Sequence, residues 1–159
     1  MRLLNASTGE IEEFLGSPSS NVVPPYAILS HRWGRDEVTF QEYNAGTAKA
    51  GLYKIQQTLR RALNQGLNYA WVDTCCIDKT NSAELSEAIN SMFNWYEKAA
   101  ICFAYLDDVD PDHRQTGDPP FGFTSSLWFG RGWTLQELLA PSEVQFLASD
   151  WSFINTRRT

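Results

Sequence analysis

The chain has 159 residues, of which 43% are hydrophobic, and its formal net charge is -6. This length suits one compact domain with its own core and is too short for two domains of ordinary size. An acidic chain offers no positive field to a phosphate backbone, so nucleic acid is not expected as a partner. The sequence contains neither an apolar run of the ~20 residues that a membrane span needs nor the apolar core of a signal peptide, which predicts a cytoplasmic protein with no membrane partner.

The first half of the chain predicts a strand followed by a helix. An apolar run over residues 26–30 follows two prolines and predicts a buried strand. The polar residues 31–37 come next and are expected to form a loop at the carboxyl end of that strand. Apolar residues then recur at helical spacing over residues 51–65, and Gly66 follows as a helix C-cap. The order is therefore strand, loop, helix.

A second strand and helix are predicted after Gly66. Residues 69–78 are apolar apart from Asp73, as expected for a central strand that leads into a site loop. Asn81 with Glu84 resembles a capping box and predicts the start of a helix. One apolar stripe along that helix is formed by Leu85, Ala88, Ile89, Met92, Phe93 and Tyr96.

The second half of the chain completes an α/β pattern. Residues 101–106 and 144–148 predict a third and a fourth strand, and a short helix lies between them and ends at Pro141. Strands that alternate with helices imply right-handed crossovers, and therefore a mostly parallel sheet of four to five strands with helices on both faces. In such sheets a ligand binds at the carboxyl ends of the strands, where the strand order reverses.

The short helix before Pro141 carries an indole and a carboxylate four residues apart. Leu135, Leu138 and Leu139 cluster on one side of this helix and are expected to hold it to the core. Trp133 and Glu137 lie together on nearly the opposite side. We therefore expect these two side chains to face outward or into a cleft.

Residues 30–33, at the end of the first strand, contain several polar side chains. Ser30, His31 and Asp73 are the residue types of a serine hydrolase, but the Gly-x-Ser-x-Gly pattern is missing and adjacent residues on an extended segment point to opposite faces. Ser30, His31, Arg32 and Trp33 are instead expected to shape a loop, in which His31 or Arg32 meets a phosphate. A purely structural role for this loop stays open.

The cysteines predict no metal site and no disulfide framework. Cys75 and Cys76 are adjacent, in an apolar segment, and no C-x-x-C spacing accompanies His31 or His113. We therefore expect free, buried thiols and no metal.

Three long segments of this chain resemble the signature blocks of the fungal heterokaryon-incompatibility (HET) domain. These blocks are YAILSHRWG at residues 26–34, WVDTCCIDK at 71–79 and RGWTLQE at 131–137. The resemblance spans about residues 2–148, so residues 1–159 are interpreted as one HET effector domain. It implies the N-terminal module of a larger receptor-like protein, with nucleotide-binding and repeat regions downstream, that triggers cell death in innate immunity after non-self recognition.

The HET family resembles, more remotely, the Toll/interleukin receptor (TIR) domains, which have a flavodoxin-like fold. The segment WTLQEL at residues 133–138 is similar to the tryptophan-cysteine-leucine-x-glutamate-leucine pattern of NAD-cleaving TIR domains, with Thr134 in place of the cysteine. This resemblance implies that Glu137 is the catalytic carboxylate and that Trp133 is an aromatic wall of the nucleotide site. It further implies NAD or NADP as substrate, no cofactor, and activity in a homo-oligomer.

The residues themselves leave alternatives open. A single glutamate suffices for breaking the nicotinamide–ribose bond, because the transition state resembles an oxocarbenium ion and nicotinamide leaves as a neutral ring. In a structural interpretation Trp133 is a core aromatic and Glu137 a solvated helix residue. Asp73 either contacts a ribose hydroxyl or caps a nearby loop. The alternative function is a non-enzymatic, self-assembling signalling module that recruits a downstream executor through the surface of the helix at residues 81–99.

Overall fold

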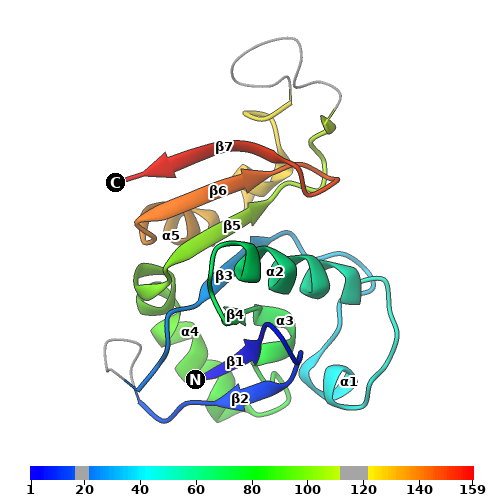
Figure 1. The fold of residues 1–159 in the computed structure, drawn as a ribbon, viewed down its shortest axis with the longest axis vertical. Helices are drawn as coiled ribbons and strands as arrows, with labels where there is room; N and C mark the ends of the chain where they lie inside the picture. The colour runs from blue at the N-terminus through cyan, green and yellow to red at the C-terminus, as the bar shows by residue number, and fades with distance from the viewer. Residues whose placement is uncertain (17–21, 112–121) are drawn as a thin grey trace.

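A computed structural model describes residues 1–16, 22–111 and 122–159. These residues form a seven-stranded sheet with the strand order β2-β1-β4-β3-β5-β6-β7 (Figure 1). The strands are β1 (Arg2–Asn5), β2 (Ile11–Glu13), β3 (Ala27–His31), β4 (Tyr69–Trp71), β5 (Ile101–Tyr105), β6 (Glu143–Leu147) and β7 (Phe153–Arg158).

The four central strands of the sheet are parallel. β3 pairs with β4 and β5, and β5 pairs with β6, all in parallel register. Numbered by their order in the chain, these four strands lie across the sheet in the order 2-1-3-4. This is the flavodoxin-like arrangement. The predicted α/β fold with a largely parallel sheet is therefore confirmed, and the strand order reverses between β3 and β5.

Three antiparallel edge strands enlarge the sheet beyond the four to five strands that the sequence predicts. β1 pairs with β2 and β4, and β7 pairs with β6. β2 has only three residues and β7 is mostly polar, so neither carries the apolar run that marks a buried strand. These edge strands are formed by pairing with the parallel core, which their own sequences do not reveal.

Helices cover both faces of the sheet, as predicted. They are α1 (Phe40–Asn44), α2 (Leu52–Asn64), α3 (Asp73–Cys76), α4 (Ser82–Lys98) and α5 (Thr134–Leu139), together with the 3-10 helix η2 (Leu127–Gly130). α2 packs on β3 and β4, while α4 and α5 lie beside each other behind the sheet in the view of Figure 1. Gly66 follows α2 with a positive φ of 74°, which confirms the predicted glycine stop. No helix among the described residues is both long and apolar enough to cross a membrane.

The second predicted strand is shorter than expected. β4 ends at Trp71, and the chain turns at once into the one-turn helix α3, with Asp73 as its first residue. Cys75 and Cys76 are buried in this turn, and all three cysteines of the chain are free thiols, as expected. The prediction of a strand through residue 78 was wrong because an apolar run alone does not distinguish a buried strand from a buried helical turn.

Helix α4 begins where the sequence predicts. The Asn81 side chain accepts hydrogen bonds from the backbone N–H groups of Ala83 and Glu84. In a complete capping box the Glu84 carboxylate would also accept from the Asn81 N–H. Here it accepts from the Asp78 N–H instead and pairs with Arg2. Helix α4 is thereby tied to the first strand of the sheet.

The apolar stripe of α4 is turned relative to the prediction. Ala88 and Tyr96 are buried as expected, and Trp95 joins them against Trp71. Ile89 and Phe93 are exposed instead of packed. The sequence stripe spans a wider arc than one sheet covers, so its outer edge stays in solvent.

Candidate functional site

Two polar networks lie at the carboxyl end of β3, one on each face of the sheet. Ser30 and His31 are the last two residues of this strand and both are buried, so the expectation that they belong to a loop was wrong. Successive side chains of a strand alternate between faces. Ser30 accordingly contacts Glu137 in α5, and His31 contacts Lys54 in α2. The predicted opposite orientation of these two neighbours is confirmed.

The first network surrounds the Glu137 carboxylate. Arg131 donates to it from both terminal guanidinium nitrogens, Nη1 and Nη2, over 2.8 Å and 3.1 Å, and the Ser30 hydroxyl donates to Glu137 Oε2. Trp128 Nε1 in turn donates to Ser30 Oγ over 2.8 Å. The Glu137 side chain is 4% exposed, whereas that of Arg131 is 21% exposed. Arg131 therefore closes this network toward solvent.

The expected facing of helix α5 was wrong for Leu135, Leu139 and Glu137, whereas Leu138 packs against the core as expected. Leu135 and Leu139 are exposed, while Glu137 is buried on the side of the helix that meets the sheet. Trp133 is half-exposed and is the residue before the first helical residue of α5. A hydrophobicity pattern assigns a carboxylate to the solvent side, but Arg131 and Ser30 offset the cost of burying Glu137. The indole and the carboxylate consequently do not share one exposed surface.

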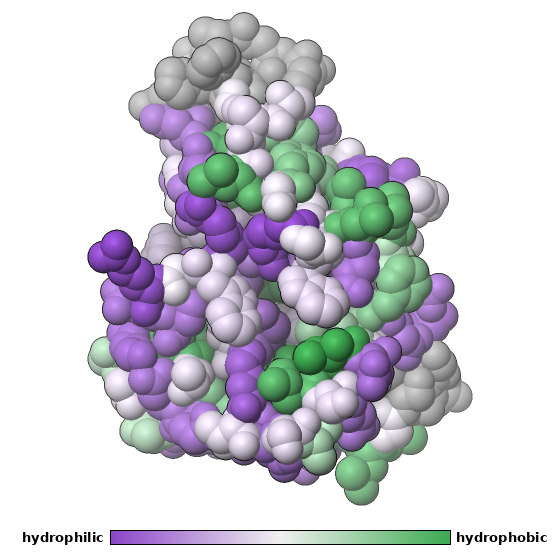
Figure 2. Space-filling model, turned by 180° about the vertical axis from the view of Figure 1, so that it is seen from behind, coloured by the Kyte–Doolittle hydropathy of each residue, from purple (hydrophilic) through white to green (hydrophobic). Residues whose placement is uncertain are grey.

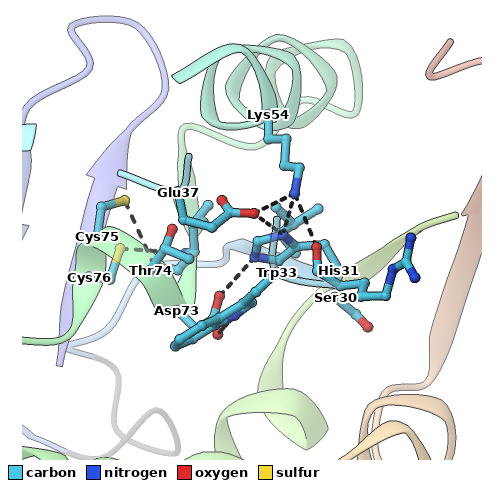
Figure 3. A network of polar contacts seen from close by, with 12 residues as sticks. Ser30, His31, Trp33, Glu37, Lys54, Asp73, Thr74, Cys75 and Cys76 are labelled. Atoms are coloured by element: carbon cyan, nitrogen blue, oxygen red, sulfur yellow. Dashed lines mark hydrogen bonds and ion pairs between the residues drawn. The ribbon is translucent and has the colours of Figure 1, made fainter. Parts of the chain in front are cut away.

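The second network joins His31, Trp33 and Asp73 (Figure 3). His31 Nε2 lies 3.0 Å from Asp73 Oδ1, and Trp33 Nε1 donates to Asp73 Oδ2 over 2.7 Å. A carboxylate only accepts hydrogen bonds, so these partners assign the imidazole proton to Nε2. On the other side of the ring, Nδ1 lies 3.4 Å from Lys54 Nζ and 3.8 Å from Glu37 Oε1. The network thus fixes both nitrogens of a buried imidazole.

Charged side chains that the sequence did not single out hold this second network in place. Lys54 pairs with Glu37 and donates to the Arg32 carbonyl over 3.1 Å. Lys79 Nζ lies 4.5 Å from the centre of the Trp33 ring. Lys79 belongs to the second signature block, whereas Lys54 lies on the polar side of a predicted helix and carries no local signal. Half-exposed Trp33 is thereby anchored at both its ring and its N–H.

Asp73 is held in its ionised form by this network. Burial raises the pKa of Asp73, but the contact with His31, the charge of Lys79 and the hydrogen bond from Trp33 together bring this pKa below its usual value. A carboxylate with a depressed pKa stabilises the fold fully above the unfolded-state pKa of about 3.9 and loses this effect as the pH falls toward the folded-state pKa.

We expect Asp73→Asn to lower the free energy of unfolding by an amount that depends on pH. The difference from wild type is largest near neutral pH. It shrinks as the pH falls below about 4, where Asp73 is protonated first in the unfolded chain and, at lower pH, also in the folded chain. Denaturant titrations at several pH values measure this difference. Asp36→Asn, at an exposed carboxylate, serves as the control. A difference that stays constant down to acid pH contradicts the assignment.

An ion pair spans the point at which the strand order reverses. Arg32 follows β3, Asp107 follows β5, and Arg32 Nη2 lies 3.0 Å from Asp107 Oδ2. In doubly wound sheets this crevice between neighbouring carboxyl ends is the usual ligand position. Both side chains remain partly exposed, so a phosphate is able to compete for the guanidinium.

Other chemistry finds less support in this geometry. His31 pairs with Asp73, but the Ser30 hydroxyl lies on the other face of the sheet, so the three side chains form no hydrolase triad. Within residues 1–16, 22–111 and 122–159, no three His, Cys, Asp or Glu side chains are grouped to hold a metal ion. His113 lies outside the described residues. The site is therefore built from carboxylates, indoles and cations.

The fold and the polar carboxyl edge define a doubly wound α/β domain, and comparison with known proteins assigns its family. Residues 26–120 match the family described as Heterokaryon incompatibility protein (HET). The chain is 48% identical over 167 aligned residues to Vegetative incompatibility protein HET-E-1 of Podospora anserina, across 100% of this chain and 12% of that protein. The chain belongs to the HET family and spans about an eighth of this curated relative. No solved structure matches it.

Proposed function

We propose that this chain is the effector domain of a fungal cell-death protein and that it hydrolyses the nicotinamide–ribose bond of NAD or NADP when copies of it associate. Membership of the HET family supports the cell-death role. The observation that carries the enzymatic part is the Glu137 carboxylate, which is buried and oriented by Arg131 and Ser30 at the carboxyl edge of a parallel sheet.

The proposed reaction needs one positioned carboxylate. The bond between nicotinamide N1 and ribose C1′ breaks, nicotinamide leaves as a neutral ring, and water supplies the hydroxyl group at C1′ and releases a proton. Positive charge develops on the ribose as this bond breaks. A carboxylate in a site of low dielectric constant stabilises that charge far more than it would in water. Glu137 takes this role in the proposal.

The described arrangement is a closed state of the proposed site. Both oxygens of Glu137 are bound by Arg131, and one also accepts from Ser30, so a ribose reaches the carboxylate only after Arg131 moves. Arg131 is the partly exposed member of this network and adjoins the loop that leads into α5. Once displaced, its guanidinium is suited to bind a substrate phosphate. A site that is closed in the monomer and opened by association suits a toxic activity.

The remaining predicted substrate contacts keep their proposed roles, except for His31. The half-exposed indoles of Trp33 and Trp133 supply flat faces for the nicotinamide or adenine ring. Arg32 is proposed to meet a phosphate at the strand-order reversal. Asp73 is proposed to contact a ribose hydroxyl, while His31, which the sequence placed with Arg32 as a candidate phosphate contact, is now proposed to hold Asp73 in place.

Nicotinamide release from an enforced oligomer tests this proposal. The chain is fused to a trimeric coiled coil and incubated with NAD or NADP, and free nicotinamide is measured. We expect Glu137→Gln to reduce release by about 100-fold or more, the usual cost of removing a preorganised electrostatic contact. Glu143→Gln, at a carboxylate on β6 that pairs with Arg158, is expected to leave release unchanged. Equal release by wild type and Glu137→Gln would reject the catalytic role.

A second candidate is the non-enzymatic signalling module. Exposed Ile89 and Phe93 favour it, because an apolar strip on α4 suits recruitment or assembly without chemistry. This candidate predicts that an assembled Glu137→Gln protein still signals.

A further inference from the structure

Large apolar side chains remain exposed on the two helices behind the sheet. They are Ile89 and Phe93 of α4 and Leu135 and Leu139 of α5, and their exposed fractions lie between 43% and 66%. Each helix presents its pair four residues apart, on one side of the helix. α4 and α5 contact each other, and Figure 2, which views the molecule from this side, shows apolar residues gathered there. We call these four residues the α4–α5 face.

The α4–α5 face carries no net charge although the chain is acidic. No Asp, Glu, Lys or Arg occurs in α4 between Ala88 and Tyr96. The one charged residue of α5 is Glu137, which points to the opposite, buried side. The rest of the chain supplies a formal net charge of -6. Exposed Glu97, one turn after Phe93, borders the face and pairs with Lys98 over 3.1 Å. The face therefore combines high apolar exposure with the absence of net charge.

We infer that the α4–α5 face is the surface through which two copies of this chain associate. A two-fold contact places the same surface on both partners, so any charge in it would face its own kind. Two acidic chains consequently meet with least repulsion through an uncharged face. Aromatic and aliphatic side chains are also the composition of interface cores. A partner recognised by opposite charge would instead select the acidic surfaces of the chain.

This inference rests on the proposed function, because it names the contact that the proposed activation by association requires. α5 carries Leu135 and Leu139 on its exposed side and Glu137 on its buried side. Arg131, which closes the Glu137 network, lies just before this helix. A second copy that binds the exposed side of α5 therefore contacts the same helix that holds the proposed catalytic carboxylate.

Sedimentation equilibrium of the 159-residue chain tests the inference without any nucleotide. We expect wild type to dimerise as its concentration rises from micromolar to millimolar. Phe93→Glu and Leu135→Glu are each expected to weaken dimerisation by about 30-fold, the effect of losing one anchor residue of an interface. Both side chains are exposed, so circular dichroism should show unchanged folding.

Tyr53→Glu is the matched control, because Tyr53 is equally exposed but lies on α2, over the other face of the sheet. It is expected to dimerise like wild type. A chain that stays monomeric at millimolar concentration, or dimerisation that survives both α4–α5 substitutions, would overturn the inference. Nicotinamide release from the enforced coiled-coil trimer is measured separately, so failure of the interface and failure of the enzymatic proposal are distinguishable.

Discussion

Replacing Arg131 with methionine should lower the free energy of unfolding by about 3 kcal/mol, at the low end for breaking a buried ion pair because Arg131 is partly exposed. The substitution keeps the aliphatic bulk of the side chain but, among the described residues, leaves the buried Glu137 carboxylate with only the Ser30 hydroxyl as a hydrogen-bonding side-chain partner. The cost comes from the uncompensated charge and not from lost packing. Urea titration measures the change through the unfolding midpoint at constant slope.

A double substitution separates these two causes. Arg131→Met combined with Glu137→Met removes both charges, and we expect it to recover most of the lost stability, since an apolar pair often replaces a buried ion pair at little cost. Arg158→Met is the matched control, because Arg158 pairs with Glu143 in an exposed position and should cost at most about 1 kcal/mol. An Arg131→Met effect as small as that of Arg158→Met contradicts the closed network around Glu137.

Loss of cell killing in Glu137→Gln is the second large effect that we expect. The chain, fused to the trimeric coiled coil and expressed in fungal cells, is expected to reduce the number of viable colonies. Glu137→Gln keeps the shape of the side chain and the ability to accept from Ser30, but it removes the negative charge that the proposed chemistry uses. Colony counts after induction and the cellular NAD content measure both consequences together.

The control and the expression level decide how the killing experiment is interpreted. Glu143→Gln should kill like wild type, and all three proteins are compared at equal abundance on immunoblots. Killing by Glu137→Gln with unchanged NAD content would favour the non-enzymatic signalling module. Killing by wild type with loss of NAD, and neither effect in Glu137→Gln, supports the enzymatic proposal.

The parts of the fold that the sequence predicts are those with a local signal. Residues 26–30 and 101–106 are apolar runs long enough to indicate buried strands, and both became strands of the parallel core. The helix at residues 51–65 has one apolar side and a glycine stop, and it matches α2 within two residues. The edge strands β1, β2 and β7 lack such signals, because pairing with their neighbours and not their own pattern makes them strands.

The sequence singles out the residues of the candidate site but does not predict their contacts. Ser30 and Glu137 are 107 positions apart, and no local pattern indicates that one binds the other. The burial of Glu137 has no local signal either, although its partner Arg131 lies only six positions before it, because the contact with the sheet depends on distant Ser30. His31 and Asp73, 42 positions apart, were both expected near the carboxyl ends of neighbouring strands, and the structure brings them within 3.0 Å. Long-range pairing therefore limits sequence reasoning more than residue choice does.

The structure of the Glu137→Gln chain, associated through the coiled coil and bound to intact NAD, tests the central claim most directly. The account predicts that the nicotinamide ribose lies against the side chain at position 137 and that Arg131 has moved from it to a phosphate. The contrary result is a nucleotide bound elsewhere while the side chain at position 137 remains enclosed by Arg131 and Ser30.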